Sequence, residues 1–194
     1  MVLKEPRRSM KKNIFAFLLL LTAISAVIPQ YSLAEQKASA SSANIISNEI
    51  SAERDYRAKV LKEYLESQNS PLAGYANDFI VQADKYNLDW RLVAAISGVE
   101  STFGQAIPTD SYNGWGWGVY GDNVIRFKSW PDGIATVSQG LRERYIDQWK
   151  AKDIYEIGSI YASSPTWASH VEYYLKKIRA FELTDTKETL SLSI

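Results

Sequence analysis

The chain has 194 residues, of which 46% are hydrophobic and 23% charged, a composition typical of one globular domain with a core of its own. It has no cysteine, which excludes a disulfide framework and a thiol nucleophile, and a single histidine, which disfavours a zinc centre or a serine–histidine triad. The formal net charge is zero, so the chain as a whole does not have the basic character of a nucleic-acid-binding protein.

The first 34 residues have the three parts of a secretory signal. A basic start precedes the apolar run 14–28, and Ser32-Leu33-Ala34 offers small residues where a signal peptidase reads the chain. We therefore predict a signal peptide over 1–34 and a secreted or periplasmic protein of the cell envelope. The alternative is an uncleaved membrane anchor, although the apolar run is shorter than the roughly 20 residues that span a bilayer. The membrane would then be a partner only through this segment.

Without residues 1–34 the chain is acidic. That segment holds five of the 22 Lys and Arg residues but one of the 22 Asp and Glu residues, so the remainder has a net charge of −4. A general basic surface is therefore not expected, and we predict no nucleic-acid partner.

The domain that follows is predicted to be helical. Residues 35–52 are rich in Ser, Ala and Asn and are interpreted as a flexible lead-in. Apolar residues at helical spacing then predict a folded domain over 53–183, with a frayed tail over 184–194. Its first helix should stop at Asn69-Ser70-Pro71, and a second helix should follow directly.

The third predicted helix ends at a glutamate. Asp89 can cap its first turn, and Gly104 is a natural terminator. Its apolar face is formed by Leu92, Val93, Ile96 and Val99. Glu100 therefore lies in the last turn of a hydrophobic helix.

Residues 104–123 break the helical pattern with five glycines and four aromatic residues. We predict a β-hairpin over 115–127 that turns at Gly121-Asp122-Asn123. Further helices are expected to begin at Trp130, near residue 154, and at Ser164. The fold class is therefore mainly α (α+β), a helical domain with one small β-hairpin excursion.

Glu100 has the surroundings of a general acid. The negative end of the helix dipole and apolar neighbours such as Val99 and Phe103 both disfavour a charged carboxylate. Both effects raise its pKa, so this group can keep a proton near neutral pH. Cleavage of a glycosidic bond needs such an acid and requires no histidine or thiol.

The aromatic residues near Glu100 suit the flat apolar faces of sugar rings. In a hairpin, Trp115 and Trp117 would point to opposite faces, so one of them is expected to face a groove. For Trp130, Trp149 and Trp167 we expect a place in the core.

At this point the sequence resembles a known family. Residues 88–96 and the motif Glu100-Ser101-Thr102-Phe103-Gly104 resemble the catalytic helix of the lysozyme-like superfamily, which soluble lytic transglycosylases and bacterial N-acetylglucosaminidase domains share. Segments 113–118, 126–134 and 161–168 resemble the glucosaminidases, also called mannosyl-glycoprotein endo-β-N-acetylglucosaminidase-like. The resemblance covers roughly residues 72–181.

The resemblance implies a lysozyme-like fold and an exported hydrolase that cuts the glycan strands of peptidoglycan at β-1,4 bonds. It implies that Glu100 is the acid and that Tyr161 lines the cleavage subsite and helps to place the acetamido group of the substrate. The residues expected to bind substrate are Tyr112, Asn113, Trp115, Trp117 and Phe127. No cofactor and no metal are expected.

The second catalytic group is open at this stage. A nucleophile or base would be a carboxylate about 5–9.5 Å from the acid, depending on the stereochemistry. We take Asp122 as the third catalytic candidate beside Glu100 and Tyr161. Asp110 and Asp132, in the same region, are the alternatives for this second carboxylate. The acetamido group of the sugar can also serve as nucleophile.

Two other functions remain possible from the sequence. A lytic transglycosylase would use the same acid and release an anhydro sugar, but the Gly-Leu-Met-Gln loop of that group is replaced here by Gly116-Trp117-Gly118-Val119. A lysozyme-like domain without activity would bind only glycan or a partner protein.

Overall fold

A computed structural model of the chain describes residues 31–118 and 123–192, and the side chains of 42–118 and 123–185. The chain divides into two compact units, residues 1–48 and residues 49–194. The second unit contains the predicted domain and all the side chains discussed below. Residues 1–30, with most of the predicted signal, lie outside the described part, so the signal and its cleavage stay predictions.

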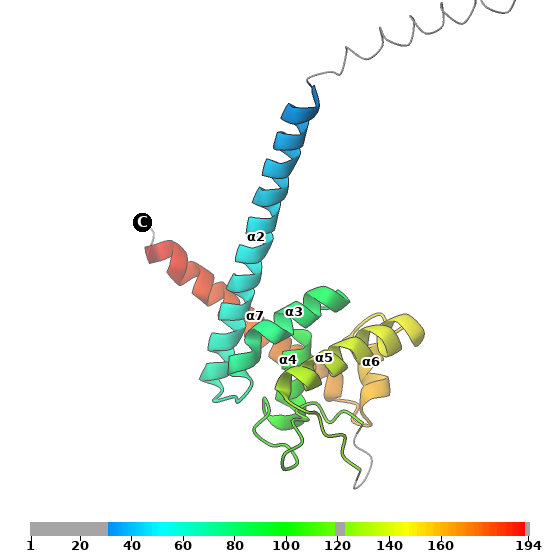
Figure 1. Cartoon of the computed structure of the whole chain (residues 1–194). Helices are drawn as coiled ribbons and strands as arrows, with labels where there is room; N and C mark the ends of the chain where they lie inside the picture. The colour runs from blue at the N-terminus through cyan, green and yellow to red at the C-terminus, as the bar shows by residue number, and fades with distance from the viewer. Residues whose placement is uncertain (1–30, 119–122, 193–194) are drawn as a thin grey trace, which may run out of the picture. The chain divides into compact units, whose positions relative to one another are not determined.

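The described chain is built of helices joined by loops (Figure 1). In chain order they are α2 (Tyr31–Ser67), the short 3-10 helix η1 (Ala73–Tyr75), α3 (Ala76–Tyr86), α4 (Leu92–Ser101), α5 (Trp130–Gly140), the π-helix η2 (Leu141–Gln148), α6 (Ile154–Tyr161) and α7 (Trp167–Leu192). The predicted mainly-α class is confirmed. Helix α2 includes residues 35–52, the predicted flexible lead-in. Within the described ranges no helix is long and apolar enough to cross a membrane.

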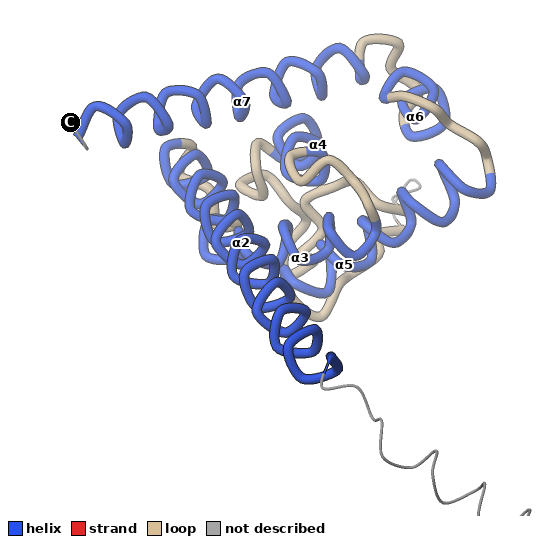
Figure 2. Tube along the Cα trace, turned by 90° about the horizontal axis from the view of Figure 1, so that it is seen from above, coloured by secondary structure: helices blue, strands red, loops and turns tan. Residues whose placement is uncertain are grey.

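The predicted β-hairpin over 115–127 is wrong for the residues that the structure describes. Residues 115–118 and 123–127 contain no strand (Figure 2). The physical reason is the side chain of Asn113, whose amide donates to the carbonyls of Trp117 (2.9 Å) and Ile125 (3.0 Å). Its carbonyl accepts from the Trp117 N–H (3.0 Å), so a side chain makes the bonds that a partner strand would have made.

Helix α4 is buried among the other helices and carries the site. Every residue from Leu92 to Gly98 is buried, and α4 packs against α7 and α5 (Figure 2). The helix starts later than predicted, at Leu92, and Asp89 bonds to the entering chain by accepting from the Arg91 N–H (3.0 Å). The small residues Ala94, Ala95 and Gly98 allow this close packing on several sides.

The chain turns sharply immediately after α4. Thr102 and Phe103 both have left-handed backbone conformations, with φ of 51° and 57°, before Gly104 at 83°. Two such residues in a row are unusual outside glycine. The Phe103 ring is buried and lies against Gly98, where a Cβ would come within 2.7 Å of it, and this burial offsets the strained backbone.

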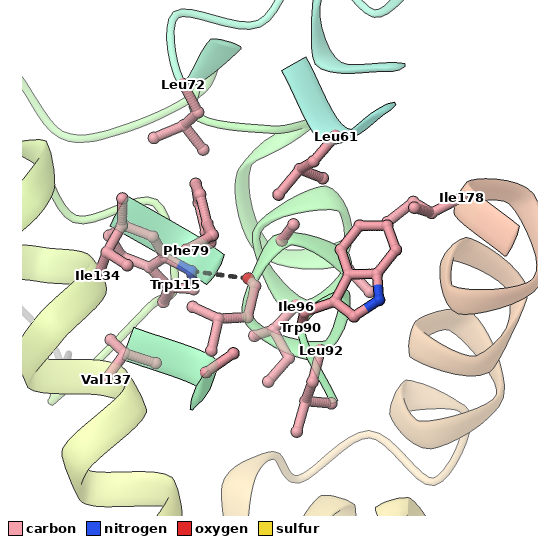
Figure 3. Close-up of a cluster of buried hydrophobic side chains, with 14 of the residues drawn as sticks. Leu61, Leu72, Phe79, Trp90, Leu92, Ile96, Trp115, Ile134, Val137 and Ile178 are labelled. Atoms are coloured by element: carbon pink, nitrogen blue, oxygen red, sulfur yellow. Dashed lines mark hydrogen bonds between the residues drawn. The ribbon is translucent and has the colours of Figure 1, made fainter. Parts of the chain in front are cut away.

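The core that supports α4 contains the first of the two loop tryptophans. The Trp115 side chain is fully buried, and its indole N–H donates to the carbonyl of Val93 on α4 (2.9 Å; Figure 3). The ring lies 6.3 Å from that of Phe79 and 6.1 Å from that of Trp130. The loop after Glu100 is thereby fastened to the helix that carries Glu100.

Candidate active site

Glu100 lies on the last turn of α4 with its two carboxyl oxygens in different surroundings. Oε1 accepts a hydrogen bond of 2.5 Å from the indole Nε1 of Trp167 at the start of α7. Oε2 lies over Gly116, where a Cβ would come within 2.8 Å of it. Gly116 has φ of 59°, so its backbone conformation and its missing side chain both leave room for the carboxyl group.

Burial raises the pKa of Glu100 above its ordinary value, and the hydrogen bond from Trp167 opposes part of this rise because it favours the charged form. The sequence indicated the same direction from apolar neighbours. The balance of the two effects leaves a carboxyl group that holds its proton to higher pH than a solvated glutamate.

Tyr161, at the end of α6, joins the loop and α7. Its hydroxyl donates to the carbonyl of Trp115 (2.6 Å), and its ring stacks on Trp167 with centroids 4.7 Å apart and an angle of 22°. Burial, with a smaller contribution from the nearby charge of Glu100, raises its pKa well above the ordinary value. Tyr161 is therefore a neutral hydroxyl whose oxygen can still accept a hydrogen bond.

Two adjoining grooves meet at Tyr161. The groove around Glu100, named the catalytic groove after this candidate acid, is lined mainly by Val99, Glu100, Ile160, Tyr161, Trp167 and His170. The aromatic groove is lined mainly by Trp117, Ile125, Arg144, Tyr145, Trp149 and Tyr161. Ile160 and Tyr161 line both, so a ligand at Glu100 can continue into the aromatic groove.

A chain of aromatic rings runs along the two grooves. From Trp167 it passes to Tyr161 (4.7 Å between centroids), then to Tyr145 (5.7 Å), and on to Trp149 (5.0 Å). Trp117 lies against both Tyr161 and Tyr145, at 5.8 and 5.9 Å. Trp167, at one end of this series, is buried, while Trp117, Tyr145 and Trp149 line the aromatic groove and give it apolar faces that suit a sugar ring.

The predicted substrate-binding residues divide into two groups. Trp117 lines the aromatic groove, as expected for one of the two loop tryptophans. Trp115 and Phe127 are instead buried, and their rings pack on each other at 6.2 Å. The prediction that these two contact substrate is therefore corrected: they belong to the core beneath the loop.

Asn113 and Tyr112 line neither groove. The Asn113 side chain is buried, and all its described hydrogen bonds go to backbone groups of residues 115, 117 and 125. It therefore shapes the loop. Tyr112 is 39% exposed and packs edge-on against Trp130, at 5.6 Å, on another part of the surface.

A second carboxylate beside Glu100 is missing from the described part of the molecule. Among described residues, Glu100 is the only Asp or Glu that lines either groove. Asp132 is used at the start of α5, where it accepts from the Lys128 N–H (2.9 Å), and the exposed Asp110 lines neither groove. Asp122 lies outside the described residues.

Three site residues were missed in the sequence. Trp167 is buried, as predicted, but its indole N–H is also bonded to Glu100, whereas Trp149, expected in the core, is 47% exposed in the aromatic groove. Arg144 gave no signal beyond its charge. Trp130 is buried as predicted. The position of Trp167, two residues after Pro165, was the available clue, since that proline limits where the last helix can start.

Among the described residues no group of three or more His, Cys, Asp and Glu side chains could hold a metal ion. Comparisons with known proteins give no further guide, because no protein-family model and no curated protein matches the chain. The chemistry of the site must therefore be argued from its own residues.

Proposed function

We propose that the protein is an exported glycoside hydrolase that cuts the glycan strands of peptidoglycan, of the endo-β-N-acetylglucosaminidase type, with Glu100 as general acid. The observation that carries the proposal is a partly buried carboxyl group with a raised pKa that lines a groove together with Tyr161 and Trp167. The resemblance of residues 88–104 to a lysozyme-like catalytic helix supports the same assignment.

Glu100 donates its proton to the glycosidic oxygen as the bond from that oxygen to the anomeric carbon breaks. With no other described carboxylate in the grooves, the acetamido oxygen of the substrate attacks the anomeric carbon and forms a cyclic intermediate. Water then opens this intermediate and returns a proton to the Glu100 carboxylate, which now acts as base. The Tyr161 hydroxyl oxygen accepts from the acetamido N–H and so aligns that group.

The test is the Glu100→Gln protein, because Gln keeps the shape and can still accept from Trp167 but has no acidic proton to transfer. We expect the release of soluble fragments from purified cell wall to fall at least about 100-fold, in line with general acid catalysis. Glu143→Gln is the matched control, since Glu143 is exposed and lines neither the catalytic nor the aromatic groove. Equal activity of the Glu100→Gln and unmodified proteins would refute the assignment of Glu100.

A lytic transglycosylase is the second candidate, and the same single carboxylate favours it. Glu100 would protonate the leaving oxygen and then take the proton of the sugar's own C6 hydroxyl, which closes an anhydro ring without water. Mass spectrometry of the fragments separates the two reactions, because hydrolysis adds the mass of one water and ring closure does not. Glycan binding by the unmodified protein with neither product would mean a binding module.

A further inference from the structure

The aromatic groove has a chemical character different from that of the catalytic groove beside it. Tyr145 and Trp149 give this groove aromatic sides. Trp149 is 47% exposed, which is unusual because tryptophan side chains are mostly buried on average. Arg144 also lines this groove, and no described Asp or Glu does so. The groove thus combines apolar faces with one positive charge.

The guanidinium of Arg144 is available for a ligand. Arg144 is exposed, and the structure records no ion pair for it within the described residues. Arg142, two residues earlier, is used structurally: its guanidinium donates to the carbonyls of Tyr86 (2.6 Å) and Asn87 and pairs with Asp147 at 3.6 Å. Two arginines of the same helix therefore have different roles.

The π-helical form of η2 brings these side chains to the groove. The Trp149 N–H donates to the Arg144 carbonyl, five residues back, at 2.8 Å, and the Tyr145 and Trp149 rings meet edge-on. Turns of this kind are rare and occur often at functional sites, since they are less favourable than α-helix. Gly140, the last residue of α5 before η2, has no Cβ and so leaves space for the Trp117 ring.

We propose that the aromatic groove is a binding site for a carboxylate-bearing sugar unit, with Arg144 as the ligand of the carboxylate and Trp149 and Tyr145 as the surface for the ring. The inference rests on the proposed function and names the part of the glycan that must lie next to the cleaved unit. In peptidoglycan the carboxylate is either the free lactyl group of muramic acid or a carboxylate of its peptide stem. Guanidinium matches both, because it binds a carboxylate through two parallel hydrogen bonds.

The inference predicts a preference for acidic over neutral glycan. Chitotetraose has the same β-1,4 backbone and acetamido groups but no carboxylate, so it gains nothing from Arg144. The contact is also ionic and exposed, so salt weakens it. Both properties can be measured without relying on cleavage.

The experiment is calorimetric titration of the full-length Glu100→Gln chain, which should bind glycan without cutting it. The ligands are a peptide-free peptidoglycan tetrasaccharide, the same tetrasaccharide with peptide stems, and chitotetraose. Adding Arg144→Gln is expected to raise the Kd for a carboxylate-bearing ligand about tenfold, as for loss of a charge-assisted hydrogen bond, and to leave the Kd for chitotetraose unchanged. The weakened ligand identifies the source: the peptide-free one means the lactyl carboxylate, and the stem-bearing one alone means the stem.

Arg179→Gln is the control, because it removes the same charge from an exposed position that lines neither the catalytic nor the aromatic groove. Arg144→Lys keeps the charge but loses the paired bonds and should give an intermediate Kd. Equal affinity of the Arg144→Gln and Arg144 proteins for both acidic ligands would overturn the inference and leave the proposed function standing. Failure of all three glycans to bind would overturn both.

Discussion

Trp167 acts on Glu100 through one hydrogen bond, and this makes it a positioning residue in the proposed reaction. Its N–H favours the charged carboxylate, while burial favours the protonated form. The protein thus combines an apolar site that keeps the proton with a donor that accepts the carboxylate once the proton has left. A general acid that must also serve as base needs both properties.

Trp167→Phe should move the alkaline limb of the activity profile to higher pH. The acid works only when protonated, so activity falls as pH rises through the Glu100 pKa. Removing the N–H donor takes away the effect that lowers this pKa, so the fall comes later. The measurement is kcat/KM for wall fragments against pH. Phe keeps an aromatic face for Tyr161, which limits the loss of packing.

Trp149→Phe is the control for that profile, because Trp149 lines the aromatic groove away from the Glu100 carboxyl group. It is expected to raise KM and leave the limb in place. A Trp167→Phe profile with an unmoved or acid-shifted limb would contradict the role given to the indole N–H.

At the scale of elements, the Gly-rich loop and α4 form one unit around Glu100. Gly116 is the closest point of approach, since its φ is positive and its missing Cβ leaves room for Oε2. We expect Gly116→Ala to lower kcat/KM at least about tenfold by displacing the carboxyl group, and to cost about 1–2 kcal/mol of stability from the left-handed backbone.

Gly74→Ala is the matched control, because no heavy atom other than those of the adjoining chain lies within 4 Å of the Cβ it would add. Wall-lytic rates and urea midpoints of the two variants measure both effects. Full activity of Gly116→Ala would mean that the loop can move away from Glu100 without consequence, and would contradict a functional role for the close approach of Gly116 to Oε2.

The start of helix α5 could be predicted from local sequence, whereas the structure of the Gly-rich loop could not. Helix α5 begins at Trp130, as predicted. The Ser129 hydroxyl accepts from the Asp132 N–H, the Asp132 carboxylate accepts from the Lys128 N–H, and Pro131 fits the first turn. The described residues of 113–118 and 123–127 were misjudged because alternating Gly and Trp imitate the period of a strand. The hydrogen bonds of Asn113, which reach up to 12 residues along the chain, form a different structure.

At the scale of the whole molecule, the two loop tryptophans have separate tasks. Trp115→Phe should lower the free energy of unfolding by about 1–3 kcal/mol, because it opens a cavity in the core and removes the bond to the Val93 carbonyl. Trp117→Phe should change stability by less than that and raise KM instead, since Trp117 is half-buried at the aromatic groove.

Urea denaturation of the two variants, followed by the remaining tryptophan fluorescence, compares them directly. Equal loss of stability in both would contradict the assignment of one residue to the core and the other to the groove.

The sequence alone determined the helical class, the presence of α4 and the position of Glu100 in its last turn, because these depend on periodicity and on neighbours within one or two turns. Packing of distant segments decided the rest. The indole of Trp167 reaches a carboxylate 67 positions earlier, Trp115 turns into the core while Trp117 stays at the groove, and Arg144 joins them from a π-helix. Such pairings leave no local pattern, since each side chain's task depends on what the fold brings beside it.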